Sequence, residues 1–303
     1  MTTNKLITQG QVRQITGFGA DVIEKVLDDL GLDKKGAQAV IGRGGEFGSL
    51  IMPSILSALQ SLSVSERFKD EEVDSRYGYL SGYKPKGLNE QMNQLRILFP
   101  GIGFCNQDLF TQIERDDVKL PKHAEGWFAI PNWMRNPQIF GTTYSDALLK
   151  VLNMIKKARN GKFYNYREGQ INEKNIHQSD RTREFWKKLS NDQGNPDILI
   201  VPAQFGIRHR GRSVRRACEI FVGNEFGLGA FAVGVMILTH PERLQNFDDL
   251  WIDCAGDEFA ANADGDCSRA PYFGFGDSDI KVGTGWVDDA DSDYGSASGF
   301  LPQ

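Results

Sequence analysis

The chain has 303 residues, of which 40% are hydrophobic and 25% are charged, the composition of an ordinary globular protein. A chain of this length can bury a sizeable core, so it needs no disulfide or metal ion in order to fold. The net charge of −5 excludes a chain that is basic throughout, as many nucleic-acid binders are.

The first 65 residues are predicted to form a helical region. Apolar residues recur at helical spacing from Val12 to Leu30, and Asp33 has the position of a helix N-cap. Residues 11–27 resemble the helix-turn-helix of bacterial repressors, with Gly17 at the turn. The second helix of such a motif would present two acidic side chains where a DNA-reading helix carries Arg, Lys, Asn or Gln. We therefore expect simple helical packing here rather than contacts with DNA.

Residues 66–120 are predicted to be a linker, because a polar, turn-rich segment at residues 81–87 precedes one short helix at residues 89–98. Residues 121–303 are predicted to form an α/β or α+β domain. In chain order, its expected elements are a helix from Ser145, a buried strand at Asp197–Pro202, a helix at Ser213–Val222, a buried strand at Phe231–Thr239, a helix from Pro241, a strand at Leu250–Asp253, and a hairpin or meander from Pro271. The predicted fold class is thus a helical N-terminal region followed by a mixed sheet domain with a β-rich C-terminal tail.

Cysteine usage and hydropathy indicate the compartment. The cysteines form neither a CxxC pair nor a zinc-finger spacing, so we expect free thiols in a reducing cytoplasm; they are Cys105, Cys218, Cys254 and Cys267. The N-terminus is polar and lacks the apolar core of a secretory signal. The longest uncharged apolar run, residues 226–238, is shorter than the ~20 residues that span a bilayer. We expect a cytoplasmic protein without a membrane partner.

Charge is distributed unevenly along the chain. Residues 150–216, the basic stretch, contain sixteen Lys and Arg against six Asp and Glu. Residues 248–293, the acidic stretch, contain thirteen Asp and Glu against two basic residues. Such stretches create local potentials much larger than the net charge suggests. Either the two stretches neutralise each other in the fold, as in a structural or protein-interaction module, or they form separate binding surfaces.

The most distinctive segment is the arginine loop, residues 206–216, which follows a predicted strand and opens a predicted helix. Free backbone N–H groups at such a helix start bind anions, and Arg offers a planar fork that matches phosphate oxygens. The predicted anion-binding residues are Arg208, Arg210, Arg212, Ser213, Arg215 and Arg216, with Ser213 as the N-cap. The function that this segment favours is binding of a phosphate-bearing partner, either a nucleic acid or a nucleotide.

An enzymatic alternative is a Mg²⁺-dependent phosphoesterase or nuclease. Asp253 ends a predicted strand, and Asp257 and Glu258 follow it in a loop, where several carboxylates together can hold Mg²⁺ against phosphate oxygens. His209, within the arginine loop, is then the candidate acid or base. The alternative requires that both loops leave one edge of a parallel sheet.

The run ILIVPAQFGIRHRGRSVRRA at residues 198–217 and the ending SGFLPQ resemble an uncharacterised bacterial protein family with no known activity. The resemblance implies a bacterial, cytoplasmic setting. It implies no reaction, cofactor or oligomeric state.

Overall fold

The computed structural model of the chain describes residues 8–62, 66–261 and 265–302. The chain divides into two compact units, residues 1–59 and residues 60–303. The first corresponds closely to the predicted helical region at residues 1–65.

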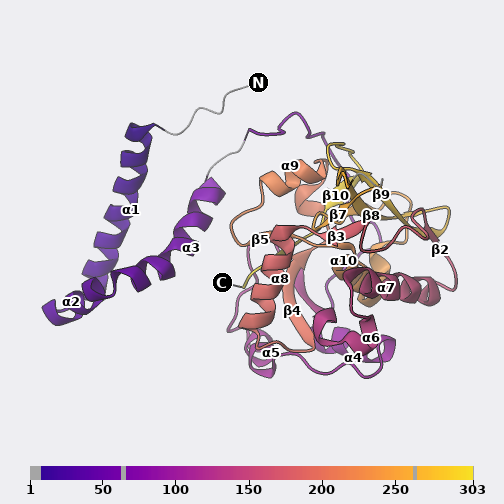
Figure 1. Ribbon diagram of the computed structural model, residues 1–303, viewed down its shortest axis with the longest axis horizontal. Coiled ribbons are helices and arrows are strands. Elements are labelled where there is room, and N and C mark those ends of the chain that lie inside the picture. The colour runs from indigo at the N-terminus through magenta and orange to yellow at the C-terminus, as the bar shows by residue number, and fades with distance from the viewer. Residues whose placement is uncertain (1–7, 63–65, 262–264, 303) are drawn as a thin grey trace. The chain divides into compact units, whose positions relative to one another are not determined.

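The described part of the first unit is helical (Figure 1), and its helices are α1 (Gln9–Leu30), α2 (Lys34–Gly42) and α3 (Gly44–Leu62). Thr8 and Gln11 form a capping box at the start of α1. Asp33 caps α2, because its side chain accepts a 2.6 Å hydrogen bond from the Gly36 N–H. The predicted N-cap is confirmed.

The described residues 11–27 do not form a helix-turn-helix. α1 continues without interruption through Gly17 and ends at Gly31, whose φ of 57° is the left-handed conformation of a helix C-cap. The resemblance to a repressor motif therefore does not extend to the backbone, which forms one continuous helix here. A glycine inside a helix costs about 1 kcal/mol relative to alanine, which is too little to break a helix that is capped at its start.

The second unit contains two β-sheets. In the four-stranded sheet, with strand order β1-β4-β11-β5, every pair is antiparallel. Its strands are β1 (Gly126–Pro131), β4 (Ile198–Gln204), β5 (Glu225–Gly227) and β11 (Ser298–Phe300). The inner strand β4 coincides with the strand predicted at Asp197–Pro202, and all of its residues are buried.

The seven-stranded sheet is mixed. Its path is β10-β6-β8-β7-β3, with β9 between β8 and β2, and only the pairs β10–β6 and β2–β9 are parallel among its described strands. The strands are β2 (Phe163–Asn165), β3 (Ile176–Gln178), β6 (Trp251–Asp253), β7 (Asp257–Phe259), β8 (Arg269–Gly276), β9 (Asp279–Trp286) and β10 (Tyr294–Ser296). β8 and β9 form the predicted C-terminal hairpin. Asp277 and Ser278, with φ of 52° and 65°, make its two-residue turn.

A fully buried helix, α10 (Ala230–Thr239), lies where a strand is predicted at Phe231–Thr239. That prediction is wrong, because an uninterrupted apolar run has no periodicity with which to distinguish a buried strand from a buried helix. α10 packs against α7 (Tyr144–Ala158), as Figure 1 shows. Gly234 permits this close approach, since a Cβ at that position would lie 2.6 Å from the Val151 side chain.

Residues 66–120 belong to the second unit and do not form a separate linker. They contain α4 (Leu88–Leu98) and α5 (Gln107–Glu114). Leu88, Met92 and Leu95 recur at helical spacing on α4 and are buried, and α4 contacts β1. The apolar face of α4 thus makes this segment part of the core.

The other described helices of the second unit are η1 (Trp133–Arg135), α6 (Pro137–Phe140), α8 (Asp180–Asp192), η2 (Ile207–His209), α9 (Val214–Glu219) and η3 (Pro241–Arg243). The helix predicted from Pro241 is the single turn η3. Across the ranges described, no helix combines the length and the apolar character needed to cross a bilayer. The fold class expected from the sequence, a helical N-terminal region followed by mixed and antiparallel sheets, is confirmed.

Candidate functional site

The arginine loop has the predicted strand-loop-helix order, β4 followed by η2 and α9. Ser213 caps α9 as expected, because its Oγ accepts a 3.1 Å hydrogen bond from the Arg216 N–H. The same Oγ donates to Glu71 at 2.6 Å, and the Nε of Arg215 donates to both carboxylate oxygens of Glu71 at 2.8 and 2.9 Å. A carboxylate of the protein itself therefore occupies the start of this six-residue helix.

Glu72, next to Glu71, neutralises further cations of the loop. Its carboxylate lies 3.3 Å from Arg212 Nε and 2.5 Å from Arg216 Nε. Arg210 is exposed, and its guanidinium donates to the Tyr77 carbonyl at 2.9 Å. Little positive charge of the loop is therefore left to meet an external anion, although its predicted role in anion binding stays a prediction.

The pairing differs from the one suggested by the two charged stretches. The glutamates that pair with the loop lie at residues 71, 72 and 225, outside the acidic stretch. Arg215 also approaches Asp288 of that stretch, at 3.8 Å. The loop is thus neutralised mainly by glutamates outside the acidic stretch. A count of charges along the sequence does not identify them as its partners.

Arg208 and His209 contact a buried carboxylate, Glu225. His209 Nε2 lies 2.8 Å and Arg208 Nε 3.1 Å from its Oε1. Burial opposes ionisation of Glu225, but the hydrogen bond from His209 and the charges of His209 and Arg208 outweigh it and lower the pKa of Glu225 to about 2. Burial also lowers the pKa of His209, whereas Arg208 beside it carries a permanent positive charge. His209, the candidate catalytic histidine, is 1% exposed, and its ring contacts Glu225 rather than the solvent.

The three predicted metal ligands are not assembled into one site. Asp257 accepts hydrogen bonds from the Tyr144 hydroxyl and the Ala230 N–H, whereas Glu258, next to it on β7, pairs with His177 on the opposite face. Asp253 is buried on β6. Moreover, β4 and β6 belong to different sheets, so the two loops do not leave one edge of a parallel sheet, although Val214 and Ala255 pack in one small buried cluster.

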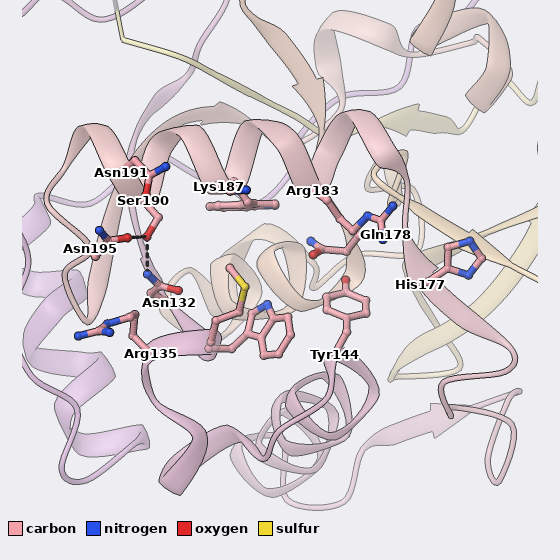
Figure 2. Close-up of a pocket in the computed structure, with 13 residues that line it drawn as sticks. Asn132, Arg135, Tyr144, His177, Gln178, Arg183, Lys187, Ser190, Asn191 and Asn195 are labelled. Atoms are coloured by element: carbon pink, nitrogen blue, oxygen red, sulfur yellow. Dashed lines mark hydrogen bonds between the residues drawn. The ribbon is translucent and has the colours of Figure 1, made fainter.

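A pocket of about 560 Å³ lies elsewhere, beside α8. Figure 2 shows its lining side chains, which come from η1 and the residue before it, the start of α7, the end of β3, and α8 with the loop that follows. They are Asn132, Trp133, Met134, Arg135, Tyr144, His177, Gln178, Arg183, Trp186, Lys187, Ser190, Asn191 and Asn195. A small cavity of about 20 Å³ shares several of these residues and adds the apolar side chains Ile130, Leu199 and Phe231.

Two polar atoms in the pocket wall are buried without a hydrogen-bond partner among the described residues. Asn132 follows β1, and its Nδ2 donates to Ser190 Oγ at 2.9 Å and to the Pro196 carbonyl at 3.2 Å. Its Oδ1, which points into the pocket in Figure 2, has no partner. The indole N–H of Trp186, on α8, also has none. An unpaired buried polar group costs about 1–3 kcal/mol, so a hydrogen-bond partner for either atom would stabilise this wall.

The lining is cationic. Arg135, Arg183 and Lys187 contribute positive charge, and none of the described residues that line the pocket is a carboxylate. Arg183 pairs with Asp180, one turn earlier on α8. Arg135 and Lys187 have no ion pair with any residue that the structure describes. The pocket wall therefore carries positive charge that no described acidic side chain neutralises.

Tyr144 links the pocket to a buried acid. Its hydroxyl donates to Asp257 at 2.7 Å, and Asp257 also accepts from the Ala230 N–H at the start of α10. Burial, only partly offset by these two hydrogen bonds, raises the pKa of Asp257 to about 7. Gly229 is needed for this arrangement, because a Cβ there would lie 2.2 Å from Asp257 Oδ1. The link holds Tyr144 in place at the pocket.

The sequence did not indicate this pocket. Its residues come from segments separated by up to 63 positions, and none forms a motif. The available signals were weak: Trp133 and Arg135 come soon after a buried strand, and Trp186 is a large aromatic residue in an otherwise mostly polar helix. Only the packing of α8 near the end of β1 brings these residues together.

Comparisons with known proteins add no relative to this description: no protein-family model matches the chain, and neither does any curated protein or solved structure that was searched.

Proposed function

We propose that the protein binds a small phosphate-bearing molecule with a planar ring, of nucleotide size, in the pocket beside α8. The main support for this proposal is that two buried polar atoms in the pocket wall, Asn132 Oδ1 and Trp186 Nε1, have no hydrogen-bond partner among the described residues. One accepts and the other donates a hydrogen bond, so together they complement a ligand edge that offers both a donor and an acceptor. The edge of a nucleobase has this character.

The size and the remaining lining agree with that class. Ligand pockets for small molecules span about 300–1,000 Å³ and combine aromatic walls with a few polar groups. Trp133 and Trp186 supply ring surface for stacking, which is favourable for any flat, polarisable ring. Arg135 and Lys187 supply cations for a phosphate, which both side chains bind readily.

This proposal keeps the ligand class suggested by the sequence and assigns it to a different site. The arginine loop offers cations that are largely paired with Glu71, Glu72 and Glu225. The pocket offers unpaired cations together with unsatisfied polar atoms and a cavity. Both conditions favour the pocket for a small ligand.

Calorimetric titration of the full chain with nucleoside monophosphates and with the matching nucleosides tests the proposal. We expect the monophosphates to bind more tightly. Lys187→Gln should weaken monophosphate binding about tenfold, or ~1.4 kcal/mol, and leave nucleoside binding nearly unchanged. Lys188→Gln is the matched control, because Lys188 neighbours Lys187 on α8 but pairs with Asp192 at 2.9 Å and does not line the pocket.

A second variant separates stacking from hydrogen bonding. Trp186→Phe keeps an aromatic ring and removes the indole N–H, so it should weaken monophosphate and nucleoside equally. The proposal is overturned if no nucleotide binds at millimolar concentration. It is also overturned if Lys187→Gln and Lys188→Gln have the same effect.

A further inference from the structure

Three potential metal ligands meet at the edge of the seven-stranded sheet. His177 on β3 and Glu258 on β7 are direct partners in the antiparallel register, so their side chains lie on one face. His177 Nε2 is 2.9 Å from Glu258 Oε2 and 4.0 Å from the sulfur of Cys267. One ligand atom from each of the three residues lies within 4.8 Å of the other two.

We propose that His177, Glu258 and Cys267 bind a zinc ion. Imidazole nitrogen, carboxylate oxygen and thiolate sulfur are the three donor types that zinc takes in proteins, with bond lengths of about 2.0–2.3 Å. A tetrahedron with such bonds places its ligand atoms about 3.3–3.8 Å apart. The observed separations of 2.9 and 4.0 Å bracket that range, so small side-chain rotations complete the set.

The surroundings favour a cation. The carboxylates of Glu258 and Asp266 lie close enough to Cys267 to act on it electrostatically. Their negative potential attracts a divalent ion. An exposed His–Glu pair contributes little to stability, so stabilising the fold does not account for this cluster. Binding a metal ion does account for the position of the Cys267 thiol beside the pair.

The three ligands that the described residues supply leave the fourth position of zinc open, as in zinc sites that bind an exchangeable water or ligand. His177 also belongs to the lining of the pocket and lies at its edge in Figure 2. The open position is therefore near the pocket. The zinc site depends only on its three ligands and holds whether or not a nucleotide binds.

Metal titration of the full chain, stripped with a chelator and free of nucleotide, tests the site. We expect one Zn²⁺ per chain, and with Co²⁺ a thiolate-to-metal charge-transfer absorption. Cys267→Ser should abolish that absorption and weaken Zn²⁺ binding at least tenfold. His177→Gln should weaken binding similarly and keep a thiolate band at saturating Co²⁺.

Cys218→Ser is the matched control, because Cys218 is also a half-buried free thiol and lies outside the cluster. It should bind both metals as the unsubstituted chain does. Binding should also weaken as the pH falls, since the imidazole and the thiol must both be deprotonated. Absence of stoichiometric Zn²⁺, a cobalt complex without a thiolate band, or equal affinities of Cys267→Ser and Cys218→Ser would each overturn the proposal.

Discussion

The buried carboxyl of Asp253 provides a sharp test of the electrostatics of this fold. Asp253 lies on β6, opposite Tyr272 of β8 and Ser296 of β10, and is 8% exposed. Burial, followed by the nearby carboxylates of Asp291 and Asp293, raises its pKa to about 8 from an ordinary value of 3.8. Asp253→Asn keeps the shape of the side chain and removes the ionisable group.

The sign follows from the direction of the shift. A carboxyl whose pKa is higher in the folded state stabilises the fold fully below pH 3.8, and this contribution is lost as the pH rises towards 8. Each pKa unit corresponds to about 1.36 kcal/mol, so the rise from 3.8 to about 8 corresponds to a complete loss of about 6 kcal/mol. The asparagine variant cannot ionise and escapes this loss. We expect it to match the unsubstituted chain within about 1 kcal/mol at pH 4 and to exceed it by several kcal/mol at pH 9.

Urea unfolding of both proteins at pH 4, 6, 8 and 9 measures the difference. Asp248→Asn is the control, because Asp248 is an exposed acid close in sequence. A stability difference that does not change with pH, or a variant that is less stable at pH 9, would refute the reasoning. The same proteins test the predicted Mg²⁺ ligand: a Mg²⁺-dependent rise in melting temperature that Asp253→Asn abolishes would support the enzymatic alternative.

Two further predictions concern the arginine loop. Glu225→Ala leaves the buried His209 and the half-buried Arg208 without their partner, so we expect a loss of about 3–5 kcal/mol in urea unfolding. The exposed Glu173→Ala should lose almost nothing, and a loss below about 1 kcal/mol for Glu225→Ala would show that the network is not structural. If the loop binds polyanions as its sequence predicts, the chain is retained on heparin at low salt and elutes steeply with added salt, and Arg210→Ala elutes earlier. Unchanged elution of that variant would exclude the exposed arginine as a contact.

The elements that the sequence determined by itself are those whose signals are local. α7 has an apolar stripe at helical spacing, β4 is a short apolar run next to turn residues, and Asp33 and Ser213 cap helices through hydrogen bonds to residues three positions away. The C-terminal hairpin likewise depends on neighbouring residues. These features were predicted correctly because their causes lie within a few residues.

Tertiary structure decided the rest. α10 is a helix rather than a strand. A wholly apolar segment has no periodic pattern that distinguishes the two. Glu71 and Arg215 are 144 positions apart, and His177 and Glu258 are 81 apart, so their pairing depends on how distant segments pack. Charge neutralisation and ligand geometry depend on distances between side chains in space. A count of arginines or acids along the sequence gives no such distances. The pocket beside α8 and the His177–Glu258–Cys267 cluster exist only because the packing of two sheets and their helices brings those side chains together.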